Sequence, residues 1–262
     1  MVDRYILINK IFERWVIRLK NVIALPVEFE REQIKLTIFP TIIQDENNLI
    51  LVDCGFPGFV GQIKEAMKQV GVSIQDLTKI IITHHDHDHI GALKEIVSLY
   101  PEVEVLCSEK QVPYITGQKK SLRLAQAEEN HKVLNESERV ANQKFMDMIL
   151  AVQHVTKVTT VKDGELLPIC GGVQIIDTSG HMPGHISVYI PSEKTLIAGD
   201  ALGIQNGDLC IANPQFVLDM KMAVRSIEKI SHLDVEKVIC YHGGEYDKDV
   251  KAKFKQIINA PY

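Results

Sequence analysis

No stretch of this 262-residue chain approaches the about 18 consecutive apolar residues that a membrane-spanning helix needs. The first 25 residues also lack the apolar core of a signal peptide, because seven charged side chains interrupt them. The five cysteines include no CxxC pair, a pattern that favours reduced, mostly buried thiols over disulfides. We therefore expect a soluble protein of the cytoplasm with no membrane partner.

Positive charge is not in excess either. Lysine and arginine number 29 against 34 aspartates and glutamates, so the formal net charge is −5. A broad nucleic-acid-binding surface would need clustered lysine and arginine, so we expect no nucleic-acid partner. Apolar residues make up 45% of the chain and charged residues 24%, which excludes disordered, collagen-like and coiled-coil proteins. The length suits a single domain, residues 1–262, with a full-sized core.

Short apolar segments alternate with helical patterns in the first half of the chain. Residues 34–54 favour a strand, a tight turn and a strand. Apolar residues at helical spacing predict helices over 63–70 and 91–100, and buried strands are expected at 79–83 and 103–107. This alternation indicates an α/β architecture. The second half adds a hairpin region at 164–176, strands at 186–190, 195–198 and 237–240, and helices at 219–230 and 248–258.

The middle of the chain has a different character. No glycine or proline occurs between Gly117 and Gly164, and charged residues alternate there with apolar ones. We interpret Lys119–Val152 as two amphipathic helices inside a helical insertion, residues 117–153. The pattern leaves open whether this insertion is a cap over a site or a plain structural layer.

Seven of the ten histidines lie in three short places, which packing alone does not explain. They are His84, His85, His87 and His89; His181 and His185; and His242. Aspartates accompany them: Asp86 and Asp88 lie inside the first group, and Asp200 follows an apolar strand. Imidazole and carboxylate are the usual ligands of first-row metal ions. Because each group follows a predicted strand, we expect these loops to converge on a metal centre.

The order and spacing of five motifs resemble the metallo-β-lactamase-fold hydrolases, and more narrowly their glyoxalase II and lactonase-like branch. These motifs are Asp53-Cys54-Gly55, Thr83–Gly91, Gly180–Gly184, Gly199-Asp200 and Tyr241-His242-Gly243. The resemblance implies a four-layer αββα sandwich with a metal site along one edge of its two sheets. Residues 1–33 would then be an N-terminal extension of this domain.

The resemblance also implies a ligand set for two divalent metal ions. His84, Asp86 and His181 would hold the first ion, Asp88, His89 and His242 the second, and Asp200 would bridge them. Four more residues are candidates to support this site without binding metal: Asp53, His85, His87 and His185. For His85 and His87, a simply solvated position stays open. The family usually has histidine where this chain has Asp86, and carboxylate is a harder ligand than imidazole. This shifts the preference somewhat toward manganese or iron, so we expect two divalent ions, zinc first, with manganese or iron as alternatives.

Such a site implies a hydrolase in which a hydroxide shared by two metal ions attacks an ester, thioester, lactone or phosphoester. Asp88 would orient the nucleophile and accept its proton, with Asp200 as the bridging carboxylate. We expect the insertion Lys119–Val152 and the loop Gly203–Phe216 to recognise a small-molecule substrate. A di-iron or mononuclear-iron redox enzyme and a non-catalytic metal-binding protein stay open as alternatives. The sequence also leaves a homodimer open.

Overall fold

The computed structural model describes residues 21–31 and 34–262, and two six-stranded sheets packed face to face form its centre. The first sheet has the strand order β1 (Val22–Ala24), β4 (Thr41–Gln44), β5 (Leu49–Val52), β6 (Lys79–Ile81), β7 (Glu104–Ser108) and β8 (Thr159–Val161). The second has the order β16 (Gly244–Tyr246), β15 (Lys237–Cys240), β12 (Thr195–Gly199), β11 (Ile186–Ile190), β10 (Val173–Asp177) and β9 (Leu166–Leu167).

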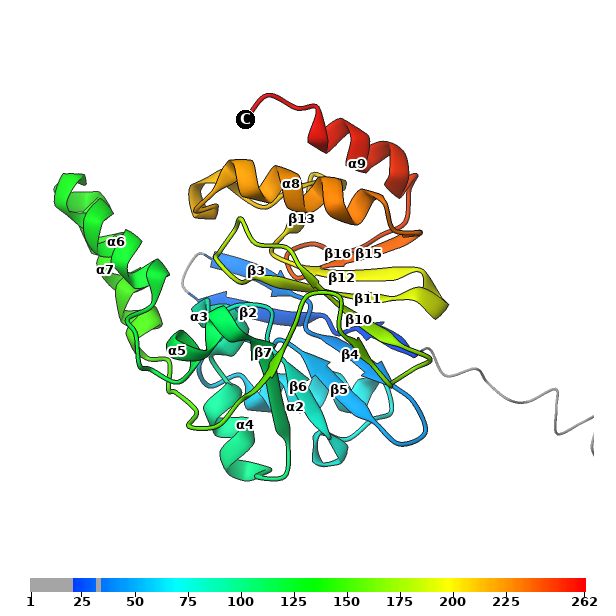
Figure 1. Cartoon of the computed structure of the whole chain (residues 1–262). Helices are drawn as coiled ribbons and strands as arrows, with labels where there is room; N and C mark the ends of the chain where they lie inside the picture. Colours follow the sequence, from blue (N-terminus) through cyan, green and yellow to red (C-terminus); the bar gives the residue numbers. More distant parts are fainter. Residues whose placement is uncertain (1–20, 32–33) are drawn as a thin grey trace, which may run out of the picture.

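Helices cover the two outer faces of this pair of sheets (Figure 1). The helices α2 (Val60–Gln69) and α4 (Leu93–Leu99) lie on the first sheet, and α8 (Met220–Ser231) and α9 (Val250–Ile258) lie on the second. The predicted four-layer αββα sandwich is therefore confirmed. Every helix in the described part of the chain is too short or too polar to cross a membrane.

Branched aliphatic side chains fill the space between the sheets. All residues of β5 and β11 are buried, as expected for strands that are covered on both faces. One cluster joins the facing strands and includes Val52 and Ile81 from the first sheet and Val188 and Ile197 from the second. Separate clusters join each sheet to its outer helices. This layered core gives the loops at the sheet edges a rigid base.

The strands that carry the predicted ligands all end at the same edge of their sheet. The strands β5 and β6 are parallel, and so are β12 and β15; β10 runs the same way as β12 because both are antiparallel to β11. Asp53 follows β5, the loop with His84 follows β6, and His181 lies in the loop after β10. Asp200 directly follows β12, and His242 lies just after β15. Ligands of α/β sheets bind at such carboxyl ends.

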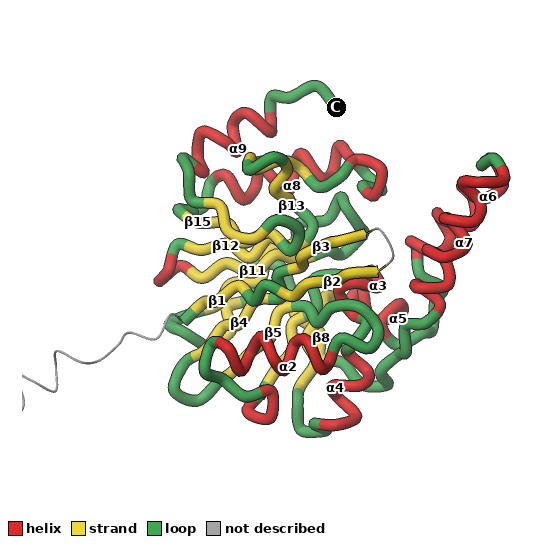
Figure 2. Tube along the Cα trace, turned by 180° about the vertical axis from the view of Figure 1, so that it is seen from behind, coloured by secondary structure: helices red, strands yellow, loops and turns green. Residues whose placement is uncertain are grey.

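The helical insertion projects from the body as a hairpin of α6 (Leu122–Val133) and α7 (Glu136–Leu150), which Figures 1 and 2 show from opposite sides. Asn135 caps α7 through a capping box with Glu138. Only the ends of the helices near the body are buried, and Val133 at the far end is 84% exposed. The two helices predicted for this insertion are thus confirmed.

Two segments differ from the sequence-based expectations. The strand β3 (Ile34–Ile38) pairs with β2 (Val27–Arg31) in a separate ribbon, and β1 joins the first sheet although it lies in the predicted extension 1–33. The rest of that extension, residues 1–20 and 32–33, lies outside the described residues. The expected loop 203–216 contains most of a second hairpin, β13 (Leu202–Gln205) and β14 (Asp208–Ile211). The expectation of a loop is therefore wrong for most of residues 203–211, which pair as two strands.

Candidate metal centre

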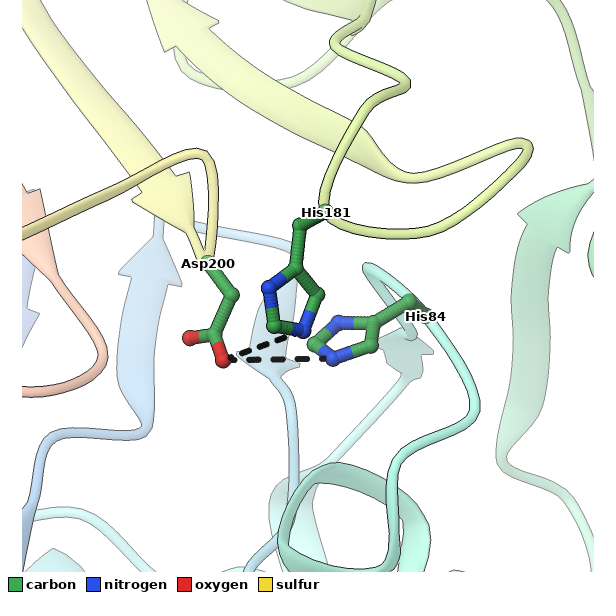
Figure 3. Close-up of side chains that lie close together, drawn as sticks. All are labelled: His84, His181 and Asp200. Atoms are coloured by element: carbon green, nitrogen blue, oxygen red, sulfur yellow. Dashed lines mark ion pairs between the residues drawn. The ribbon is translucent and has the colours of Figure 1, made fainter. Parts of the chain in front are cut away.

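Two groups of histidine and aspartate side chains meet where the sheets' carboxyl edges face each other. His84, His181 and Asp200 converge from three separate loops in Figure 3. The Oδ2 atom of Asp200 lies 4.0 Å from His84 Nε2 and 3.6 Å from His181 Nε2. We call these three residues the first metal group.

Asp88, His89 and His242 form the second metal group. The Oδ2 atom of Asp88 lies 3.2 Å from His242 Nε2 and 3.8 Å from His89 Nε2. Asp200 faces this group as well, with Oδ1 at 3.4 Å from His89 Nε2 and Oδ2 at 3.6 Å from His242 Nε2. Its carboxylate therefore lies between the two groups, where the sequence prediction placed the bridging ligand.

The hydrogen bonding of the histidines leaves atoms free for a cation. In the described part of the chain, the buried atoms His84 Nε2, His89 Nε2 and Asp200 Oδ1 have no hydrogen-bond partner. An unsatisfied buried polar group costs about 1–3 kcal/mol, and a bound cation removes that cost. The opposite nitrogens of both rings are engaged, His84 Nδ1 with Thr83 Oγ1 (3.0 Å) and His89 Nδ1 with Asp53 Oδ2 (2.8 Å). The donor set fits divalent metal ions.

Asp53 supports residues 83–91, which we call the metal loop. Its backbone has the left-handed φ of 60°, and its buried carboxylate accepts hydrogen bonds from Thr83 N (2.9 Å) and Thr83 Oγ1 (2.8 Å) as well as from His89 Nδ1. This arrangement fixes the tautomer and the orientation of the His89 ring. Asp53 does not face the other ligand atoms, in agreement with its predicted supporting position.

His185 orients Asp200 through the backbone. The Nε2 atom of His185 accepts a hydrogen bond from Asp200 N (3.0 Å), so Nδ1 carries the proton that pairs with Thr178 Oγ1 (2.8 Å). Burial, with the nearby His84 and His181 rings, holds the pKa of His185 well below its usual value. Gly199 lies against this ring with a φ of 54°, and a Cβ there would come within 2.7 Å of His185 Nε2.

His85 and His87, which alternate with the candidate ligands of the metal loop, contact the helical insertion. His85 Nε2 accepts a hydrogen bond from Leu122 N (3.2 Å), and its ring stacks on Tyr114 at 4.2 Å. Burial lowers the pKa of His85 to about 4. The ring of His87 meets the edge of Phe145 in α7 at 5.3 Å. Both histidines therefore join the metal loop to the insertion.

Asp86 has a neighbour that the sequence analysis did not single out. Its Oδ2 atom lies 3.3 Å from His84 Nε2 and 3.1 Å from His181 Nε2, near the first metal group. Arg123 of α6, which is 2% exposed, reaches the same carboxylate with Nη2 at 2.7 Å from Oδ2. Arg123 stands between two leucines in the first turn of α6, and that apolar context is the signal that the sequence offers for its burial.

Electrostatics in the metal-free protein keep the acidic ligands ionised. Burial by itself raises the pKa of Asp88, but the charge of His89 and the hydrogen bond from His242 bring that pKa below its usual value. Burial likewise disfavours protonated His242, yet Asp200 and Asp88 raise the pKa of His242 to about 10. Anionic carboxylates packed against imidazoles attract a divalent cation, which would displace the imidazole protons.

A cavity of about 490 Å³ lies over the two metal groups. Its walls come from the β3 ribbon, the segment with Phe56, the insertion and the segment 202–216. The insertion is therefore a wall of the site, which decides between the two interpretations that the sequence left open. The lining residues outside the metal groups are Leu36, Phe56, Asp86, His87, Arg123, Phe145, Met148, Leu202, Gly203, Ala212, Asn213 and Phe216.

Known proteins are similar to this chain in sequence or in fold. The chain is 30% identical over 223 residues to a probable metallo-hydrolase, YflN, of Bacillus subtilis (strain 168), covering 80% of this chain and 81% of that protein. It is 28% identical to a hydroxyacylglutathione hydrolase of Aliivibrio salmonicida, over 62% of this chain and 45% of that protein. A metallo-beta-lactamase family protein of Thermus thermophilus superposes with a TM-score of 0.69 at 21% identity, over 92% and 79% of the two chains.

The match to a family model agrees with the fold and with the site. The model of the metallo-beta-lactamase superfamily matches residues 36–242, which include all the predicted metal ligands. The chain therefore belongs to the metallo-beta-lactamase superfamily, and the prediction of a metal-dependent hydrolase of that superfamily is confirmed.

Proposed function

We propose that this protein uses two divalent metal ions, zinc before manganese or iron, to cleave an ester, thioester or lactone bond of a small molecule. The observation that carries the proposal is the carboxylate of Asp200, which lies 3.4–4.0 Å from four histidine nitrogens of two separate groups. Such an arrangement supports a pair of ions that share one bridging ligand. The hydroxyacylglutathione hydrolase among the relatives also supports hydrolysis.

The chain's own residues divide the remaining tasks. When bound, the two ions supply Lewis acidity toward the electrophile and make water more acidic. Asp88 is ionised and lines the cavity, so it can orient the attacking water and accept its proton. Tyr241 supports that position because its hydroxyl donates to Asp88 O (2.6 Å) and accepts from Gly55 N (3.1 Å). Asp53 pairs with the Nδ1 atom of His89 and so leaves its Nε2 atom directed at the second group, where a bound ion would displace the proton.

The cavity supports a substrate with an apolar body. Phe56, Phe145, Met148 and Phe216 form apolar parts of the wall. Among the described lining residues, the one arginine is Arg123, and it is paired with Asp86. A phosphoester would bring a negative charge that this wall offers little to neutralise. We therefore place phosphoesters last among the four bond types that the family resemblance implies.

The test is a substrate panel on protein whose metal content has been measured. We expect turnover of p-nitrophenyl acetate, butyrate and octanoate and of the matching acyl thioesters, with weak or no cleavage of bis(p-nitrophenyl) phosphate. Asp200→Asn is the site variant, and Asp45→Asn, in an exposed turn, is the matched control. Two irons per chain, a visible absorption band and no hydrolysis would instead indicate redox chemistry. Full metal content with neither activity would indicate a binding protein.

Location, partners, oligomeric state and domain count are proposals from the sequence. We propose that it acts in the cytoplasm on a small molecule, without a nucleic-acid or membrane partner. The net charge of −5 supports the absence of a nucleic-acid partner. A homodimer stays a prediction, as does the single domain spanning residues 1–262. Size-exclusion chromatography with light scattering would establish the oligomeric state.

A further inference from the structure

Arg123 is a permanently charged side chain buried beside only one of the two metal groups. It is 2% exposed although it starts from the insertion, and its guanidinium reaches across to the metal loop. The Nη2 atom lies 3.1 Å from His181 Nε2, the nitrogen that faces Asp200 in the first metal group. The guanidinium cannot lose its proton under ordinary conditions, so this charge is present whenever the protein is folded.

The same guanidinium forms hydrogen bonds to both carboxylate oxygens of Asp86. Arg123 Nε lies 3.2 Å from Oδ1 and 3.1 Å from Oδ2 of Asp86, and Nη2 lies 2.7 Å from Oδ2. A paired geometry of this kind is the strongest form of hydrogen bond between side chains. An Asp86 carboxylate held this way is a poorer metal ligand, because a metal ion would have to displace the bonds from Arg123.

Contacts outside the metal centre hold Arg123 in place. Its Nη1 donates to Gln126 Oε1 (2.6 Å), its Nη2 donates to Phe216 O (2.9 Å), and its guanidinium carbon lies 5.1 Å from the centre of the Phe216 ring. Gln126 Nε2 donates to Gln215 O (3.2 Å) on the same segment. The arginine is therefore locked between the insertion and the segment across the cavity, and it cannot swing away freely.

The second metal group has different surroundings. The side chain of Asp88 meets the rings of His87, His89 and His242, with nitrogen to oxygen distances from 3.2 to 3.8 Å. Imidazoles give up their protons when a metal binds, whereas a guanidinium keeps its charge. A divalent ion in the first group would therefore lie beside a guanidinium that keeps its charge, whereas the described cationic partners of Asp88 in the second group are imidazoles. Like charges a few ångströms apart in a buried site interact strongly.

We propose that Arg123 is a positioning residue that makes the two metal sites unequal. By holding Asp86 and placing a fixed charge beside His181, it leaves the second group as the tight site and the first group as the weak one. This inference rests on the proposed two-metal site, but it concerns the binding of the ions and not the bond that is cleaved.

Titration of the metal-free protein with Zn²⁺ by calorimetry, repeated with Co²⁺ by absorption spectroscopy, tests the proposal. We expect two steps in the wild type, with the second at least tenfold weaker. Arg123→Gln should tighten the weak step at least tenfold and leave the tight step within threefold. Arg123→Lys, which keeps the charge, should retain most of the gap. Arg139→Gln is the control, because Arg139 is exposed and bonds only to carbonyls of the insertion in the described structure.

Three more variants keep the test decisive if Arg123→Gln folds poorly. Asp88→Asn should remove the tight step and His181→Ala the weak one, which assigns each step to its group. The double variant Asp86→Asn with Arg123→Gln removes both charges, and we expect it to bind the second ion within threefold of the wild type. Loss of that step would show that Asp86 is an indispensable ligand and would overturn the proposal.

Other outcomes also count against the inference. Two equal steps in the wild type, an unchanged gap in Arg123→Gln, or no metal binding at all would each overturn it. The readout of this test is metal binding and not turnover. A failure of the proposed function can therefore be distinguished from a failure of this inference. Unequal binding that Arg123→Gln abolishes, together with no turnover of any ester or thioester, would sustain the inference and reject the hydrolase.

Discussion

Replacing Asp53 by asparagine should weaken both the fold and the second metal site. Asparagine has the same shape and tolerates the left-handed φ of 60° at this position, so the change removes charge without adding backbone strain. The carboxylate accepts three hydrogen bonds, from Thr83 N, Thr83 Oγ1 and His89 Nδ1. An amide has one acceptor oxygen, and its NH₂ group would face a ring nitrogen that already carries a proton.

The magnitude follows from these contacts. A buried hydrogen bond to a charged group contributes about 1.5–3 kcal/mol, so losing one and weakening another should lower the free energy of unfolding by about 2–4 kcal/mol. If His89 relieves the clash by moving its proton to Nε2, that nitrogen can no longer bind metal. Loss of such a supporting carboxylate typically lowers metal affinity about 10–100-fold.

Urea denaturation of the metal-free protein and Zn²⁺ titration by calorimetry measure the two effects. Asp45→Asn is the matched control, because Asp45 also accepts backbone hydrogen bonds but lies in an exposed turn far from the ligands in sequence. We expect it to cost about 1 kcal/mol at most and to leave metal affinity unchanged. Wild-type affinity for both ions in Asp53→Asn would refute the reasoning.

Three further predictions concern other residues of the site. Asp200→Ala should bind neither metal ion tightly, and elemental analysis that finds two ions per chain would remove its bridging assignment. Gly199→Ala should lower the free energy of unfolding by about 1–3 kcal/mol, because it combines a left-handed φ with a Cβ 2.7 Å from His185 Nε2. Urea denaturation measures this change, and an unchanged midpoint would contradict the prediction. The lowered pKa of His85, about 4 in the fold against an ordinary 6.5, means that the unfolded chain binds the proton more readily between these values. The stability that neutral His85 allows is therefore complete above pH 6.5 and falls by up to about 3 kcal/mol as the pH drops toward 4. Urea titrations from pH 4 to 7 should show a flatter profile for His85→Gln, and parallel profiles for the two proteins would count against this pKa.

The candidate ligands could be singled out because their signals are local, whereas their division between two metal ions came from the resemblance to the metallo-β-lactamase-fold hydrolases. The run of histidine and aspartate at 84–89 follows a buried strand directly, and so does Asp200. Strand ends are recognisable from short apolar runs, and parallel strands bring their carboxyl ends to one edge. The same local periodicity predicted the two helices of the insertion, since 3.6-residue spacing and the absence of glycine and proline act within the segment itself.

What only the tertiary structure decided are the contacts between distant segments. Arg123 lies 37 residues from Asp86 in the chain, and no periodicity within α6 shows that its arginine enters the metal centre. The cavity wall likewise combines residues that lie far apart in the chain, such as Leu36, Phe145 and Phe216. The contribution of the insertion to the site therefore depends on the tertiary packing of these segments. Secondary structure follows from local sterics and hydrophobic spacing, but the pairing of a buried charge with its partner depends on the packing of the whole chain. The sequence by itself thus determined the fold family and the positions of the expected ligands, while the folded chain determined that the two metal groups have different neighbours.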